Sequence, residues 1–297
     1  MTSRSALLWM THVWDPGTEA EFLKFCSLDY AGSPDVWLLL DARTPGLAAI
    51  RKRFDRCHVF VEDELFSRLP CTRLRGEQLY HNVHVPVLDF WLSHREYEYY
   101  WVIEFDVRYT GAWGAFFRSF EGADHDLITS HVRHFWEEPG WCWWDSLHHP
   151  AETIGRSHYL RSFNVIYRIS NRALALVHDA QRDGWSGHPE VLLPTLLHHG
   201  GYRIRDFGGC GDFVGPGDQD RFYTSGSNAD GEPSPFCSMR WRPSRVRAGL
   251  FRNRLYHPVK PVPVMEPLPE RIWFFLHWIG NRLAGHWHRL TRRDRPD

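Results

Sequence analysis

Short apolar runs alternate with longer amphipathic runs through the first half of the chain, and this alternation constrains the fold most strongly. The apolar runs predict β-strands at residues 6–14, 36–41, 58–62 and 100–105. The amphipathic runs predict helices at residues 18–28, 47–54 and 78–94, the last with a kink or break at Pro86. Strands that alternate with helices favour an α/β fold around a mostly parallel sheet.

The second half continues the pattern less regularly. Further strands are predicted at residues 126–132, 161–170 and 201–208, and further helices at 170–184 and 188–201. Residues 208–243 are rich in Gly, Asp, Ser and Pro, and they predict a long functional loop. The chain is therefore divided into an α/β catalytic domain over residues 1–266 and a distinct tail over residues 267–297.

Charge and cysteine usage exclude several classes of protein. The 297 residues carry 35 basic and 36 acidic side chains, so no global positive field is available to hold nucleic acid. The six cysteines show no C-x-x-C spacing, which predicts free thiols in a reducing compartment. The apolar N-terminal stretch is too short for a signal peptide, and no apolar run reaches the roughly 18–20 residues that span a bilayer. A cytoplasmic protein, soluble or peripheral to a membrane, is expected.

Two acidic residues close the predicted strand at residues 100–105. Glu104 and Asp106 lie on the same side of that strand because strand side chains alternate. A charged pair that ends a buried strand is costly unless it has partners, and carboxylate oxygens suit Mg²⁺ or Mn²⁺. The alternative is a surface ion pair.

Taken in order, the Glu104-Phe105-Asp106 motif, Glu190 in GHPEVLLPTL and His257 in LYHPVK resemble the GT-A glycosyltransferase superfamily. The resemblance covers residues 6–260. It implies a Rossmann-like mixed sheet flanked by helices, a nucleotide-sugar donor and a saccharide or lipid-linked acceptor. It also implies that Glu104, Asp106 and His257 hold a divalent cation, Mn²⁺ or Mg²⁺, and that Glu190 acts as base in an inverting transfer.

One departure from the superfamily leaves metal dependence open. The first acid is Glu104 where Asp is usual, and some GT-A enzymes with altered motifs work without metal. Arg108 and Lys260 could neutralise a diphosphate in either case, although single cations are often solvated surface charges. Asp41, which ends the second predicted strand, is a candidate for the base or ribose of the donor, or a simple turn residue.

The acceptor side is expected to involve Glu190 and an aromatic loop. A carboxylate near a helix N-terminus is held in place and can deprotonate an acceptor hydroxyl, although a first-turn Glu also stabilises a helix without any catalytic role. The loop supplies a predicted acceptor platform, because sugar C–H faces stack on indole rings and carboxylates accept sugar hydroxyls; its alternative is a hydrophobic plug. The predicted platform residues are Trp141, Trp143, Trp144 and Asp145.

The tail has the pattern of an amphipathic helix with a basic end. Ile272, Phe275, Ile279 and Leu283 recur along one helical face, and several arginines follow. This combination suits contact with an anionic membrane at the inner face, or docking of the helix on the catalytic domain.

These observations favour an inverting glycosyltransferase of surface polysaccharide or glycolipid biosynthesis. The alternatives are a non-catalytic carbohydrate-binding or scaffold protein of the same fold, and a metal-dependent phosphodiesterase, which would need a tighter cluster of carboxylates. The motifs H-E-x-x-H, G-x-S-x-G and G-x-x-x-x-G-K-[ST] are absent from the sequence, which argues against zincin proteases, serine hydrolases and P-loop enzymes.

Overall fold

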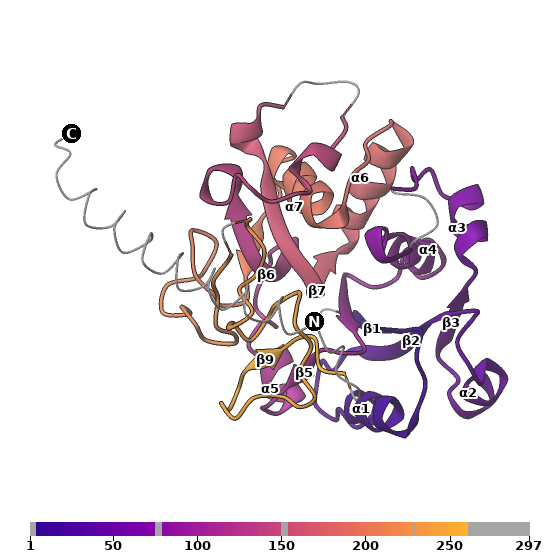
Figure 1. Cartoon of the computed structure of the whole chain (residues 1–297). Coiled ribbons are helices and arrows are strands. Elements are labelled where there is room, and N and C mark those ends of the chain that lie inside the picture. Colours follow the sequence, from indigo (N-terminus) through magenta and orange to yellow (C-terminus); the bar gives the residue numbers. More distant parts are fainter. Residues whose placement is uncertain (1–3, 75–78, 150–153, 229, 261–297) are drawn as a thin grey trace, which may run out of the picture.

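The computed structural model describes residues 4–74, 79–149, 154–228 and 230–260. Within them a seven-stranded sheet has the order β3-β2-β1-β4-β7-β6-β8 (Figure 1). Its strands are β1 (Ser5–Thr11), β2 (Asp35–Asp41), β3 (Cys57–Phe60), β4 (Tyr99–Glu104), β6 (Leu127–His134), β7 (Leu160–Ser170) and β8 (Ile204–Asp206). A second, two-stranded sheet pairs β5 (Arg108–Tyr109) with β9 (Leu255–Tyr256).

The large sheet is mixed. Strands β3, β2, β1 and β4 are parallel neighbours, whereas β7 is antiparallel to both β4 and β6. The expectation of an α/β fold with a mixed sheet flanked by helices is confirmed, and the arrangement is compatible with a Rossmann-like fold.

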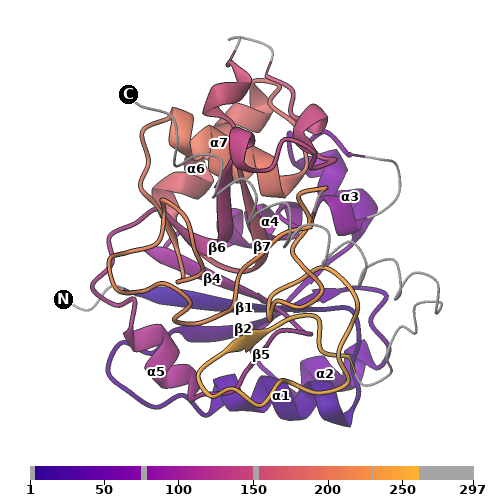
Figure 2. The ribbon, with the colours of Figure 1, turned by 60° about the vertical axis from the view of Figure 1, so that its left-hand side comes forward.

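Helices cover both faces of the sheet (Figure 2). One face carries α1 (Pro16–Cys26), α2 (Leu47–Arg53) and α5 (Trp113–Arg118). The other carries α3 (Glu62–Arg68), α4 (Val85–Ser93), α6 (Asn171–Arg182) and α7 (Pro189–His199). Short 3₁₀ turns lie at η1 (Leu79–His81), η2 (Phe135–Glu137), η3 (Trp144–Ser146) and η4 (Arg156–His158).

Strand β1 is a continuous apolar run because both of its faces are buried. Ala6 and Leu8 pack into the core beneath α4, α6 and α7, while Leu7 and Trp9 pack into the core beneath α1 and α5. A strand buried on both faces needs a continuous apolar run, because neither set of alternating side chains meets water. The same side-chain alternation fixes the pairing register of the strand.

Several expected boundaries differ from the structure; the strand expected at residues 6–14 ends at Thr11, and the strand expected at 201–208 is the short β8. The helix expected at residues 78–94 is instead the short η1 turn followed by α4, and Pro86 lies in the first turn of α4. Proline is tolerated there because a first-turn N–H has no helical partner, so Pro86 marks a helix start and not a kink. The strand expected at residues 58–62 ends at Phe60, because Glu62 begins α3.

The long loop after β8 is ordered by a buried carboxylate. Asp206 accepts hydrogen bonds from the backbone N–H groups of Gly208 and Gly209, both at 2.9 Å, and from the Tyr223 hydroxyl. A Cβ on Gly209 would lie 2.2 Å from the Tyr223 oxygen, so only glycine permits this approach. The loop is therefore fixed against the end of the sheet.

The predicted amphipathic tail lies outside the described residues. Among the residues that are described, no helix has the length and apolar character needed to cross a membrane. All six cysteines are free thiols, as predicted.

Candidate active site

The two small strands bring distant parts of the chain together. Arg108 in β5 pairs with Tyr256 in β9, and the Val259 N–H donates to the Asp106 carbonyl at 2.8 Å. His257 is thereby placed beside the end of β4. Its Nε2 lies 3.4 Å from Asp106 Oδ1 and 3.8 Å from Glu104 Oε2.

These three residues form a possible metal-binding cluster. One ligand atom from each of Glu104, Asp106 and His257 lies within 4.8 Å of the others. The prediction that Asp106 and His257 meet at one site, about 150 residues apart in sequence, is confirmed. Two carboxylates and one imidazole supply the oxygen and nitrogen ligands that Mn²⁺ accepts.

A backbone carbonyl sets the orientation of the His257 ring. Its Nδ1 lies 2.7 Å from the Arg240 carbonyl oxygen. A carbonyl can only accept, so Nδ1 carries the hydrogen and donates. Nε2 is then directed at Glu104 and Asp106, an arrangement typical of histidines that bind metals.

The cluster places two carboxylates side by side, next to His257 and Lys260. Burial, reinforced by the neighbouring Asp106, raises the pKa of Glu104 to about 7. Burial also acts to raise the pKa of Asp106, but His257 and Lys260 outweigh it and hold that pKa below its usual range. The buried Asp106 Oδ1 accepts no well-formed hydrogen bond from the described residues. An additional cation would satisfy this oxygen and stabilise both carboxylates.

The cluster forms one side of a pocket of about 570 Å³, within the range of small-ligand sites. His12, which follows β1, contributes to the same wall, and Glu190 lines the pocket as well. The pocket lies beyond the carboxyl ends of β1 and β4, where ligands bind in open α/β sheets.

Glu190 lies in the first turn of α7, whose N-cap is His188. The preceding residue is held by the Asn164 amide, which donates to the Pro189 carbonyl at 3.2 Å. Burial raises the pKa of Glu190 to about 8, although Arg161 opposes this shift. The prediction that Glu190 faces the same cleft as the acidic motif is confirmed.

Of the four predicted platform residues, only Trp143 lines the pocket. Its ring stacks on His188 at a centroid distance of 4.4 Å. Trp141 and Trp144 are each 2 % exposed and pack together in the core, so the structure supports the alternative of a hydrophobic plug for them. Asp145 is exposed outside the pocket and pairs with Arg156.

The predicted donor-binding residues also separate. Lys260 lines the pocket, with its Nζ 3.5 Å from Asp106 Oδ2. Asp41 does not line the pocket, because its carboxylate is engaged by the Arg43 guanidinium at 2.6 and 2.9 Å. Arg108 donates to the carbonyls of Phe105 and Val107 and supports the backbone of the acidic motif instead.

The sequence did not predict several residues that line the pocket. Asp230, Glu232, Trp241 and Arg242 all line it and all come from the loop over residues 208–243. The composition of that segment predicted a functional loop, but no spacing within it identified these positions.

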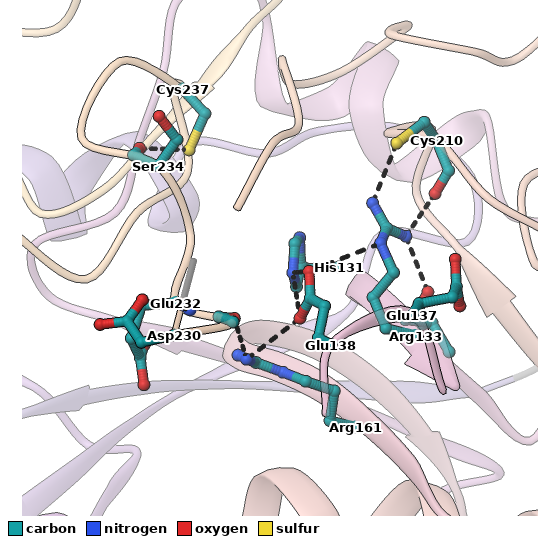
Figure 3. A network of polar contacts seen from close by, with 12 residues as sticks. His131, Arg133, Glu137, Glu138, Arg161, Cys210, Asp230, Glu232, Ser234 and Cys237 are labelled. Atoms are coloured by element: carbon teal, nitrogen blue, oxygen red, sulfur yellow. Dashed lines mark hydrogen bonds and ion pairs between the residues drawn. The ribbon is translucent and has the colours of Figure 1, made fainter. Parts of the chain in front are cut away.

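A second buried charged group was also missed, and we call it the Glu138 network (Figure 3). Glu138 is contacted by His131 Nε2 at 2.8 Å and by Arg161 NH1 at 3.3 Å. Burial acts to raise the pKa of Glu138, but His131 and Arg161 outweigh it and lower the pKa to about 2. Arg161 also donates to the Gly231 carbonyl, so the network fastens the loop segment with Asp230 and Glu232 to β7.

Comparison with known protein families finds a match over part of the chain. The family described as a protein of unknown function (DUF3405) matches residues 58–125. This segment contains β4 and both acidic residues of the cluster. No curated protein matches the chain in sequence.

Proposed function

We propose that this protein is a glycosyltransferase that moves a sugar from a nucleotide-sugar donor to a hydroxyl acceptor with inversion. The observation that carries the proposal is the placement of the Glu104–Asp106–His257 cluster and Glu190 around one pocket. Leaving-group stabilisation and acceptor activation are the two tasks of such a transfer, and the two sets of residues suit one task each.

The donor end is suited to a diphosphate. A divalent cation, Mn²⁺ or Mg²⁺, would be held by Glu104, Asp106 and His257, and it would neutralise charge that develops on the leaving phosphates. Lys260 adds a positive charge 3.5 Å from Asp106. Arg242, which also lines the pocket, provides a further cation for the phosphates.

The acceptor end is suited to a saccharide. Trp143 offers an indole face beside Glu190, and Asp230 and Glu232 offer carboxylates for sugar hydroxyls. With a pKa of about 8, Glu190 is matched to removing a proton from a hydroxyl near neutral pH. The acceptor class extends to a lipid-linked saccharide, which would place the enzyme in surface polysaccharide or glycolipid biosynthesis at the cytoplasmic face of a membrane.

The proposal is tested by a thermal-shift panel of nucleotide diphosphates and nucleotide sugars, each with and without Mn²⁺. A ligand that binds the folded state raises the melting temperature, and a hundredfold excess over Kd is worth about 2.7 kcal/mol. We expect one nucleotide class to stabilise the wild type, and the Asp106→Asn variant to lose the part that depends on Mn²⁺. No shift with any nucleotide would reject the proposal.

Binding without turnover would favour a carbohydrate-binding or scaffold protein. The hit from the panel is therefore incubated with mono- and oligosaccharide acceptors, and release of the free nucleotide is measured. Release that increases with acceptor supports transfer. Release that is independent of every acceptor points to hydrolysis instead.

A further inference from the structure

The segment that leads into β9 is strongly basic. Residues 239–260 contain seven Arg and Lys residues and no Asp or Glu, in a chain whose net charge is only −1. This segment therefore carries a local excess of positive charge that the rest of the chain balances. It lies at the periphery of the molecule in the yellow segment beside β9 (Figure 1).

The same segment exposes large apolar side chains. Leu250 is 100 % exposed, Phe251 73 % and Val246 53 %. Arg247 and Arg252 flank them, are exposed, and make no ion pair with any residue in the described part of the chain. Exposed apolar side chains gathered in one place mark interaction surfaces, whereas single ones are ordinary. We call residues 246–252 the apolar–basic loop.

The backbone holds this loop in position. The Thr110 hydroxyl donates to the Phe251 carbonyl at 2.6 Å and accepts from the Arg254 N–H at 3.0 Å. On the other side, a Cβ on Gly249 would lie 2.4 Å from the Tyr256 ring, so glycine permits the chain to pass close to β9. Before the loop, the Arg245 N–H donates to the Pro258 carbonyl at 2.8 Å, so the chain is held on both sides of Leu250 and Phe251, which face solvent.

The apolar–basic loop is connected directly to the pocket. It follows Trp241, Arg242 and Ser244, which line the pocket, and it precedes His257 of the metal-binding cluster. A surface that binds this loop would therefore hold the pocket at a fixed place close to that surface.

We propose that the apolar–basic loop docks on an anionic lipid bilayer, with Leu250 and Phe251 entering the interface and Arg247 and Arg252 contacting the headgroups. Charge complementarity selects the partner, since anionic leaflets attract clustered arginines while the acyl boundary accepts apolar side chains. Within the loop only Phe251 offers a ring for base stacking, while Val246 and Leu250 are aliphatic, which disfavours a single-stranded nucleic acid. The inference does not require the glycosyltransferase activity or the tail.

The test is co-sedimentation of the full chain with vesicles of phosphatidylcholine alone or with added phosphatidylglycerol. We expect binding to the anionic vesicles that weakens as salt is added. Leu250→Ser/Phe251→Ser and Arg247→Gln/Arg252→Gln should each weaken this binding by at least about tenfold, since each lipid-facing Arg contributes about fivefold.

Matched controls keep the outcome decisive. Leu23→Ser/Val61→Ser removes exposed apolar side chains elsewhere, and Arg51→Gln/Arg182→Gln removes the same charge from exposed helical positions. Both should sediment like the wild type, and the loop variants should keep the wild-type melting temperature because the changed side chains are exposed. Failure of the wild type to bind anionic vesicles would overturn the proposal. So would loop variants that bind as the wild type does, or a loop-dependent affinity for a DNA oligonucleotide that exceeds that for vesicles.

Discussion

The Glu138 network and the pocket cluster are both buried groups of charged side chains, yet their charges balance in opposite ways. In the network a single carboxylate is contacted by His131 and Arg161, and the pKa of Glu138 falls to about 2. In the pocket cluster two carboxylates share His257 and Lys260, and the pKa of Glu104 rises to about 7.

The difference shows how a ligand site can be told from a structural ion cluster. In the network, a carboxylate that is almost fully buried is already surrounded by cationic side chains. In the pocket cluster two neighbouring carboxylates share His257 and Lys260, and Asp106 Oδ1 accepts no well-formed hydrogen bond from the described residues. Two adjacent carboxylates beside a pocket, one of them with a buried oxygen that accepts no well-formed hydrogen bond from the described residues, therefore indicate a place for a cationic ligand.

The largest expected effect is on the chemical step. Glu190→Gln should lower the transfer rate about 10²- to 10⁴-fold, because general base catalysis contributes that much, and donor affinity should stay within about twofold. Steady-state transfer and a donor titration measure both. Glu137→Gln, an exposed change outside the pocket, is the control. Retained turnover would reassign the base and point to a retaining mechanism.

Breaking the network should reduce stability and not catalysis directly. Glu138→Gln removes the carboxylate from buried Arg161 and His131, and the free energy of unfolding should fall by about 3–5 kcal/mol. Denaturant titration near neutral pH measures the loss, with Glu96→Gln, a change of an exposed side chain outside the network, as the control. Because the pKa of Glu138 is lowered in the folded state, this contribution is present above its unfolded value near 4.5 and is lost as pH falls towards 2. If the free energy of unfolding is unchanged, the Glu138 network is not a stabilising ion cluster, and the contrast with the pocket cluster is lost.

The pH dependence of transfer should follow Glu190. Its pKa of about 8 means that the base is protonated and inactive at lower pH, so the rate should fall about tenfold per pH unit below 8. The loss from pH 8 to pH 6 is then about fiftyfold, because half of the base is ionised at pH 8 and about 1 % at pH 6. A pH–rate profile with saturating donor checks this, and a flat profile over that interval would exclude Glu190 as the ionising group.

The smallest expected effect concerns acceptor binding. Trp143→Leu should raise the acceptor KM about five- to tenfold and leave donor affinity unchanged, because the indole offers stacking surface. Trp136→Leu is the matched control, since Trp136 is 57 % exposed and stacks on His134 outside the pocket. Equal acceptor kinetics in both variants would remove Trp143 from the acceptor site.

Local pattern predicted much of the fold but not its sheet order. The apolar runs of β2, β4 and β7 were expected within about one residue of their observed bounds, because burial on both faces leaves a continuous signal. The antiparallel placement of β7 between β4 and β6 depends on packing between distant segments, and no residue in β7 signals it.

The site divides in the same way. Glu104 and Asp106 were predictable because two acidic residues directly follow the apolar run of β4, and this pattern is visible in the local sequence. His257 was expected only through the resemblance to GT-A enzymes. Asp230 and Glu232 reach the pocket because Arg161, 70 residues from Gly231, fastens their loop, and nothing near either acid indicates that contact.

The pairing of β5 with β9 has a consequence for folding during translation. Asp106 leaves the ribosome long before His257 and Lys260, so the pocket cannot close until residue 260 has emerged and the second small strand has found the first. Chains are synthesised at about 5–20 residues per second, and folding can begin while the C-terminal part is still being made. The parallel strands can therefore assemble before His257 joins Glu104 and Asp106, and a ligand of the pocket would find the complete cluster only on chains whose synthesis has passed residue 260.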